Sequence, residues 1–213
     1  MSDLADRRAE WLSVAGDPAA WRAIGLTVTD DGLVPLFGTS IRIVDGRGLS
    51  TGGIIGWTLS DVKDAVTSVD GLATDTTDAR TPVFAAHALG ASSIDHVVVM
   101  TPDLERTSAA ISAATGCELK RVREVGEMRQ GFHRIGRGGL IVELVERPEI
   151  EDGPARFWGL VLIVDDLDVA CRRIGTNLIS EPKDAVQPGR RIATVSNAAG
   201  LGLPVALMTP DAR

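Results

Sequence analysis

Tyrosine is absent from the sequence, and aromatic residues make up only 4% of its 213 residues. A core built from this chain must therefore rest on Val, Leu, Ile and Ala. Long apolar runs are also lacking: stretches such as Leu160–Val164 are far shorter than the roughly 20 residues of a membrane span. The first six residues have neither a basic nor an apolar signal region. We therefore expect no membrane span and a cytoplasmic location.

Positive charge and cysteine are scarce as well. Lys and Arg number 22 against 29 Asp and Glu, which gives a net charge of −7. A general nucleic-acid binder needs surplus Lys and Arg to displace counterions, so nucleic acid is not an expected partner. The two cysteines, Cys117 and Cys171, adjoin apolar helical segments, which predicts reduced, buried thiols. Phosphate-loop and dinucleotide-binding glycine motifs are missing.

An internal repeat is the most informative feature that is present. Shifting the sequence by 63 positions places Val97 on Leu160, Leu104 on Leu167 and Leu140 on Leu203. Repeats of this kind determine architecture before any local pattern does. We therefore predict two similar modules, over residues 91–150 and 156–210, within a domain spanning 91–213.

Each module has the pattern of a β-α-β-β-β unit. In the first, a β-branched strand over 94–101 is followed by a helix that ends at Gly116, and then by strands near 118–125, 128–135 and 139–146. In the second, a strand over 158–164 leads to an Asp165 N-cap and a helix closed by Gly175. Strands near 190–196 and 203–208 finish the module, while its second strand, expected between the helix and residue 190, is weakened by Pro182 and Pro188.

The first 90 residues read as a degenerate module of the order αβββ-βα, followed by a linker. Ser2 can cap a helix carrying Leu4, Trp11 and Leu12. Strands are expected near 25–29, 33–37 and 40–44. The run from Ile54 to Leu59 predicts a further strand and the apolar spacing of Ala65, Val66 and Val69 a helix, while 70–90 reads as the linker.

Three segments carry a family resemblance: SSIDHVVVMTPDLERTSAAISAATG, GGLIVELVE and WGLVLIVDDLDVA. Together they resemble the vicinal oxygen chelate superfamily, which includes glyoxalase I, methylmalonyl-CoA epimerase, extradiol dioxygenases and bleomycin-resistance proteins. The resemblance covers about residues 91–209. It implies an α+β fold in which paired βαβββ modules form an open, curled-sheet trough around a pocket.

The resemblance also implies where a divalent metal would be held in related enzymes, namely on the first and last strands of each module. The matching positions in the first module are His96 and Glu143, and the 63-residue offset gives Gly159 and Ala206 in the second. Strand alternation places all four on one face. Because Gly159 and Ala206 have no donor atoms, two of the four ligands are missing, and no cofactor is expected.

A catalytic metal usually needs about three protein ligands, so a metal site here would require a third ligand. His133, on the predicted third strand, is the candidate, although alternation alone does not show which face it uses. Two interpretations of His96 and Glu143 stay open: a role in binding, or a hydrogen-bonded pair in a partly buried wall. Gly159 and Ala206 are small either to make room for a ligand or because of tight packing.

Other candidates for the pocket are cationic or aromatic. Arg121 and Arg123 either project into the trough together, which would suit an anionic ligand, or belong to a solvated face. They belong to a larger group of arginines on two neighbouring strands, Arg121, Arg123, Arg129 and Arg134. The turn Gln187–Arg191 carries two guanidiniums that either hold a carboxylate or phosphate or are solvated on a loop. Trp158, next to Gly159, can stack on a flat ligand or belong to the core.

Three functional hypotheses follow from the sequence. The leading one is a small-molecule binding protein that uses the trough without a metal, closer to the bleomycin-resistance branch, with His96, Glu143, His133, Trp158 and Arg123 lining the pocket. The second is an isomerase, lyase or dioxygenase with a divalent metal held by His96, Glu143 and His133. The third is a non-catalytic dimerising scaffold. Because sheet edges of such modules need cover, a homodimer is expected.

Overall fold

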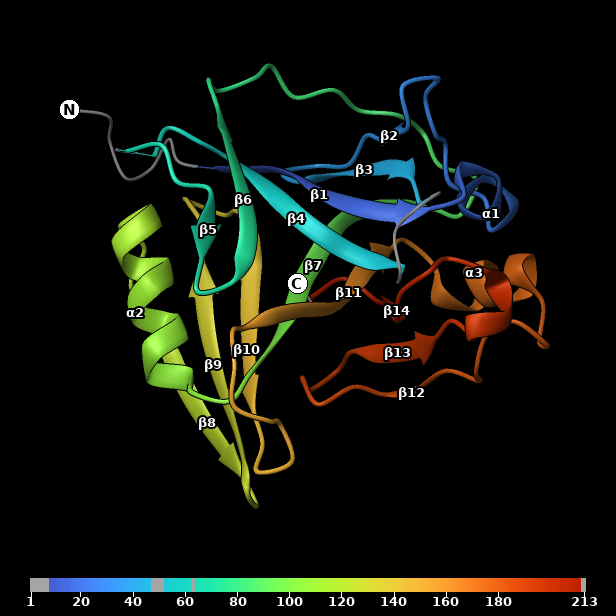
Figure 1. The fold of residues 1–213 in the computed structure, drawn as a ribbon. Helices are drawn as coiled ribbons and strands as arrows, with labels where there is room; N and C mark the ends of the chain where they lie inside the picture. Colours follow the sequence, from blue (N-terminus) through green and yellow to red (C-terminus); the bar gives the residue numbers. More distant parts are fainter. Residues whose placement is uncertain (1–7, 47–51, 63, 212–213) are drawn as a thin grey trace.

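The computed structural model describes residues 8–46, 52–62 and 64–211. The chain forms an α+β fold with two open mixed sheets, of six and eight strands (Figure 1). The eight-stranded sheet belongs to the second part of the chain and has the order β12-β13-β14-β11-β7-β10-β9-β8. No helix in the described ranges is long and apolar enough to cross a membrane.

The second part of the chain has the element order that the repeat predicts. Its first module consists of β7 (Ala91–Thr101), α2 (Leu104–Thr115), β8 (Arg121–Val125), β9 (Met128–Arg134) and β10 (Ile141–Glu146). Its second consists of β11 (Arg156–Val164), α3 (Leu167–Ile174), β12 (Lys183–Asp184), β13 (Arg191–Thr194), the short helix Asn197–Ala199 and β14 (Val205–Met208).

The two helices begin and end where local chemistry requires. Asp103 caps α2 by accepting a hydrogen bond from the backbone N–H of Arg106, and Gly116 ends it in the left-handed conformation at φ 67°. In α3 the capping residue is Asp166, which accepts from the N–H of Val169, and not the predicted Asp165. The predicted boundaries were therefore correct to within about one residue.

The register of the ladders reproduces the 63-residue offset. Antiparallel β7 and β11 pair His96 with Val161, Val97 with Leu160, and Val98 with Gly159. Each residue has a counterpart 63 positions away in the other module, and replacing both members of a pair by their counterparts gives the same three pairs again. The two modules are therefore related by a pseudo-twofold axis that passes at Val97. Strand β10 pairs in parallel with β7, and β14 pairs in parallel with β11 in the matching register. Since paired residues share a face, His96, Glu143, Gly159 and Ala206 all lie on one face, as predicted.

The first part of the chain forms a second sheet with the same plan and shorter elements. It contains β1 (Arg8–Gly16), α1 (Pro18–Ala23), β2 (Leu33–Val34), β3 (Ser40–Asp45), β4 (Gly53–Ser60), β5 (Ser68–Val69) and β6 (Leu72–Thr77). Strands β1 and β4 pair antiparallel in its centre, β3 runs parallel to β1, and β6 runs parallel to β4. This part is therefore a shortened module pair.

Several predictions for the first 90 residues were wrong. Trp11 and Leu12 lie in strand β1, whose alternating burial places Leu12 in the core, and the other expected helix residues, Ser2 and Leu4, lie outside the described residues. The helix expected after Leu59 does not form in the residues that the structure describes between Leu59 and Val69. Val69 lies in strand β5, and Asp61 has φ 54°, whereas a helix N-cap has an extended backbone. The expected linker contains β6. No strand forms over 25–29, where Gly25 turns the chain at φ 99°.

The two sheets share one core, and Figure 1 shows α2 at one side of the molecule and α1 and α3 at the opposite side. Helix α2 contacts β9 and β10 of one sheet and β5 of the other. Trp57 of β4 is almost fully buried and meets the ring of Phe157 of β11 at a centroid distance of 5.7 Å. Each sheet therefore has one face in the common core and one face turned outward.

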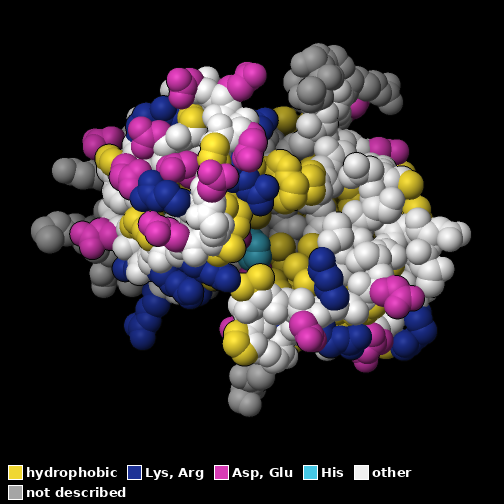
Figure 2. All heavy atoms as spheres, turned by 90° about the horizontal axis from the view of Figure 1, so that it is seen from below, with side chains coloured by type: hydrophobic (Ala, Val, Ile, Leu, Met, Phe, Trp, Pro, Cys, Tyr) yellow, Lys and Arg dark blue, Asp and Glu magenta, His cyan; other side chains and the backbone are white. Residues whose placement is uncertain are grey.

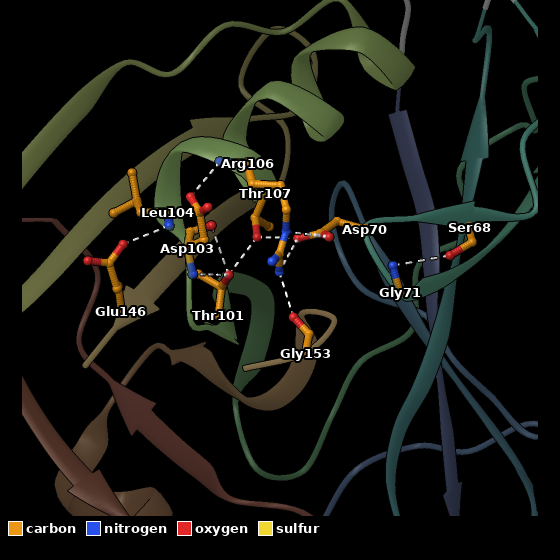
Figure 3. A network of polar contacts seen from close by, with 10 residues as sticks. All are labelled: Ser68, Asp70, Gly71, Thr101, Asp103, Leu104, Arg106, Thr107, Glu146 and Gly153. Carbon is orange, nitrogen blue, oxygen red and sulfur yellow. Dashed lines mark hydrogen bonds and ion pairs between the residues drawn. The ribbon is translucent and has the colours of Figure 1, made fainter. Parts of the chain in front are cut away.

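A polar network ties the first sheet to α2 (Figure 3). Asp70, in the β5–β6 turn, accepts hydrogen bonds from Arg106 Nε at 2.9 Å and from the hydroxyl of Thr107. Arg106 also donates to the carbonyl of Gly153 at 2.7 Å, and Glu146 accepts from the N–H of Leu104. These contacts satisfy donors at the start of α2 and hold the sheets together.

Candidate functional site

The outward face of the eight-stranded sheet carries a hollow of about 560 Å³. In Figure 2, which looks onto this side, a histidine is visible at the bottom of a depression with basic side chains on one flank and apolar ones around it. The apolar part of the lining comes from Phe132, Ile141, Val186 and Pro188. A cavity of this size suits a small organic molecule.

His96, on β7, lies between two carboxylates at the floor of the hollow. Its Nδ1 is 2.7 Å from Asp95 Oδ2, and its Nε2 is 3.2 Å from Glu143 Oε2. Gln130 donates a hydrogen bond to the other oxygen of Glu143. Both ring nitrogens therefore have an acidic partner, and the hydrogen-bonded pair considered in the sequence interpretation is present.

Asp95 was missed by the sequence interpretation, because neighbours on a strand normally face opposite sides. The ladder between β7 and β11 pairs His96 with Val161 and Ile94 with Leu162, so Asp95 is the extra residue of a β-bulge. The bulge lets Asp95 and His96 come together. A charged residue beside a histidine in an otherwise apolar strand was the available signal.

Arg190 holds the other oxygen of Asp95. Its Nη2 is 2.8 Å from Asp95 Oδ1, its Nε donates to the carbonyl of Thr209 at 2.9 Å, and only 5% of its side chain is exposed. Burial acts to raise the pKa of Asp95, but the hydrogen bonds from His96 and Arg190 outweigh it and hold that pKa below its ordinary value. The arginine turn thus binds a carboxylate, as its chemistry suggested, and that carboxylate belongs to the chain itself.

A cluster of cations lines the flank of the hollow formed by β8 and β9. Arg121 pairs with Phe132 and Arg123 with Gln130 across the ladder, so both arginines share the face of Glu143 and enter the hollow together. The cluster consists of Lys120, Arg121, Arg123 and Arg134. No described carboxylate forms an ion pair with any of its members. Arg129 differs: it lies toward α2 and binds Glu105 and Glu146.

Comparisons with known proteins agree with this architecture. No protein-family model matches the sequence, and no curated protein matches it. A halotolerant catechol dioxygenase, BphC, superposes with a TM-score of 0.66 over 98% of this chain and 88% of its own, at 12% identity. The chain has the vicinal oxygen chelate fold. Methylmalonyl-CoA epimerases also match part of the chain: for the Mycobacterium tuberculosis protein the TM-score is 0.49 at 16% identity, over 58% of this chain and 91% of that chain. For the Streptomyces coelicolor protein with 2-nitronate-propionyl-CoA the values are 0.47, 20%, 57% and 96%.

The metal set that the vicinal oxygen chelate resemblance implies does not fit the donors of this trough. Gly159 and Ala206 lie on the correct face but offer no ligand atom. A Cβ on Gly159 would lie 2.6 Å from the carbonyl oxygen of Pro204, so close packing requires glycine there. Across the described ranges, no group of three or more His, Cys, Asp and Glu side chains is arranged to hold an ion.

His133 does not supply the third ligand. It pairs with Val142, on the face opposite Glu143, and its ring is hydrogen-bonded at 3.0 Å to the Cys117 carbonyl and at 3.0 Å to Ser108 Oγ of α2. Although the residue borders the hollow, it is only 1% exposed. Burial lowers the pKa of this imidazole, with an opposing contribution from the Cys117 carbonyl. The set of His96, Glu143 and His133 is therefore not brought together.

Trp158 also lies apart from the polar floor of the trough. It is the extra residue of a bulge between Phe157 and Gly159, and it is 51% exposed. It lines a different hollow, at the seam with residues 52–55 of the first sheet. Of the five residues predicted to line the pocket, the structure places the side chains of His96, Glu143 and Arg123 on the trough face.

Proposed function

We propose that the chain binds a small anionic or aromatic molecule in its trough, without a metal. The observation that carries this proposal is the unpaired cationic cluster in a hollow of about 560 Å³. Unpaired guanidinium groups on a concave surface favour an anionic ligand, because charge-assisted hydrogen bonds are the strong ones. The apolar part of the lining leaves room for a ring or a short chain.

The polar floor supports binding rather than metal coordination. His96 has both ring nitrogens directed at carboxylates, and Asp95 is in turn fixed by Arg190. Such a saturated network is rigid and gives the floor a fixed shape. Because Gly159 and Ala206 leave the ligand set incomplete, we propose a relation to the bleomycin-resistance branch of the superfamily rather than to the glyoxalase branch.

A ligand screen by native mass spectrometry tests this function. Ligands captured by the wild-type protein are expected to bind the His96→Ala variant at least about tenfold more weakly, since the substitution leaves the Asp95 and Glu143 carboxylates at the floor without their shared imidazole partner and so disorders the floor. The Trp158→Ala variant is the matched control and should bind normally. Binding that ignores His96→Ala, or a folded protein that captures no ligand, contradicts the proposal and favours a scaffold.

The alternative function is a divalent-metal-dependent isomerase, lyase or dioxygenase of the same superfamily. Metal analysis distinguishes it from the proposed function. Protein purified without an affinity tag is analysed for bound metals as wild type and as Glu143→Gln. We expect no stoichiometric metal in either sample. A stoichiometric metal that disappears in Glu143→Gln would establish the alternative.

We also propose a cytoplasmic location and a homodimer. Cys117 and Cys171 are both free thiols, which suits a reducing compartment. Strand β8 is an edge of the large sheet and exposes Val122 and Val125, so its free hydrogen-bonding groups are available to a second copy. Light scattering after size-exclusion chromatography measures the mass, and a Val122→Lys variant should shift a dimer toward monomer.

A further inference from the structure

The cationic flank of the hollow has the geometry of a single anion site. Arg121 and Arg123 are two residues apart on one strand and share a face, so their Cα atoms are separated by about 7 Å. Long guanidinium side chains at that spacing can converge on one carboxylate or phosphate. Because neither forms an ion pair with a described carboxylate, the charge of both is available to a ligand.

The opposite flank is apolar and is held in position. Val186 and Pro188 belong to the loop between β12 and β13, and Val186 is 70% exposed, the largest exposure among the large hydrophobic side chains of the described segments. Backbone hydrogen bonds from Ala185 to Arg190 and from Arg190 to Gln187 close this loop. The buried ion pair of Arg190 with Asp95 anchors it to β7. The exposed valine therefore stays at the rim of the hollow.

Phe132 completes the arrangement between the two flanks. It pairs directly with Arg121 on β8 and lies next to Glu143 on β10, so its ring is on the trough face between the arginines and the polar floor. A ligand whose charged end meets Arg121 and Arg123 would place its adjoining atoms over Phe132. Burial of Phe132 and Val186 against an apolar body adds affinity that a bare anion cannot gain.

We infer that the ligand is an amphiphilic anion: a carboxylate or phosphate ester whose acid group is held by Arg121 and Arg123 and whose apolar body, about one aromatic ring in size, lies between Phe132 and Val186. This inference rests on the proposed function and specifies its ligand class. The carboxylate and the phosphate share the same recognition chemistry, and the probes below distinguish them.

Calorimetric titration with four probes tests the inference. Phenyl phosphate and 3-phenylpropanoate carry both features, inorganic phosphate lacks the apolar body, and 3-phenylpropan-1-ol lacks the charge. We expect at least one aryl anion to bind roughly tenfold or more tightly than either incomplete probe. The stronger of the two aryl anions identifies phosphate or carboxylate as the preferred group. Added salt should weaken the binding of the anions and leave the alcohol unaffected.

Two variants test the two contacts, and a third serves as the control. The double variant Arg121→Gln, Arg123→Gln should remove the advantage of the anions, and Val186→Ser should weaken the aryl probes while leaving inorganic phosphate unchanged. Arg137→Gln, an exposed arginine that does not line the hollow, is the matched control and should bind like wild type. Circular dichroism and melting curves show that each variant is folded.

The outcomes separate the ligand class from the function. If the alcohol binds as tightly as the acids and its binding depends on His96, the proposed function stands and the ligand class is wrong. The class is equally wrong if the double variant behaves like Arg137→Gln, or if neither aryl anion binds at millimolar concentration. If, in addition, the screen finds no ligand that depends on His96, the proposed function also fails.

Discussion

The two sheets of this chain share a plan and differ in what covers their outer faces. In the first sheet, Trp11 on the outer face of β1 is covered by Arg42 and Arg80, whose guanidinium carbons lie 4.9 Å and 5.4 Å from its ring centroid. Arg80 belongs to the irregular segment after β6, which runs along the outside of this sheet (Figure 1). In the second sheet the corresponding face is an open hollow with an unpaired cationic cluster.

The same strand topology carries different side chains on the outer faces of the two sheets. Arginines are present on both outer faces, but those of the first sheet are occupied by an indole and by Asp31, whereas those of the second meet no described carboxylate. Shortened helices and strands in the first sheet leave it as support for the shared core. The two outer faces therefore differ in the side chains that fill them and not in the fold.

The strongest way to break this comparison is to disrupt the core that both sheets share. Trp57 is 1% exposed, and its Nε1 donates to Thr74 Oγ1 at 2.7 Å. Trp57→Ala should lower the free energy of unfolding by about 3–5 kcal/mol, because it leaves a large cavity. Urea denaturation measures the loss, and both sheets should unfold in one transition. Trp158→Ala, the same substitution at an exposed site, should cost less than about 1 kcal/mol; two separate transitions would show that the sheets fold independently.

A second prediction sharpens the role of the buried pair under the hollow. Arg190→Met should destabilise the protein by about 3 kcal/mol, because the Asp95 carboxylate is left buried without its guanidinium partner. Adding Asp95→Asn should recover part of this loss, so the double variant is more stable than the sum of the single losses predicts. Chemical denaturation of the four proteins gives the coupling. Strict additivity would show that Arg190 and Asp95 do not act as a unit.

A third prediction concerns the pH dependence of stability and tests His133 on the core face of the large sheet. The pKa of His133 is lowered in the folded state, mainly by burial, so the unfolded chain binds a proton more readily. Its contribution to stability is therefore fully present above the ordinary value of 6.5 and is lost as the pH falls from there through the lowered folded pKa. His133→Gln should remove this part of the pH dependence when unfolding free energies are measured between pH 7.5 and 5. An unchanged profile would mean that the ring is not confined as described.

The sequence predicted the fold well where local signals agree with pairing. Asp and Gly caps, β-branched runs and the 63-residue offset all favour the same βαβββ order in the second part of the chain. In the first part, Leu4, Trp11 and Leu12 have the i, i+7 and i+8 spacing of one helical face, yet pairing with β3 and β4 places Trp11 and Leu12 in a strand. Tertiary pairing overrides local propensity there.

The candidate site was predictable to the extent that alternation applies. His96 and Glu143 were named by the family resemblance, and alternation along regular strands placed them on one face and allowed the two arginines of β8 to project together. Asp95 did not, because the bulge that redirects it depends on the register with β11. Its contact with Arg190 spans 95 residues of sequence, and His133 could be assigned to a face only through its pairing with Val142.

The smallest expected effect concerns the covered face of the first sheet. Arg80→Ala removes one cation from the Trp11 ring and should cost less than about 1 kcal/mol, the range of exposed cation–π contacts. Since Arg42 still covers the indole and lies beside Asp31, the face should remain closed to ligands. Calorimetry with an aryl anion should therefore still give one site per chain, with the affinity of the wild-type protein. A second site in Arg80→Ala would show that a single side chain keeps the first trough from binding, and the contrast between the two sheets would then rest on Arg80 alone.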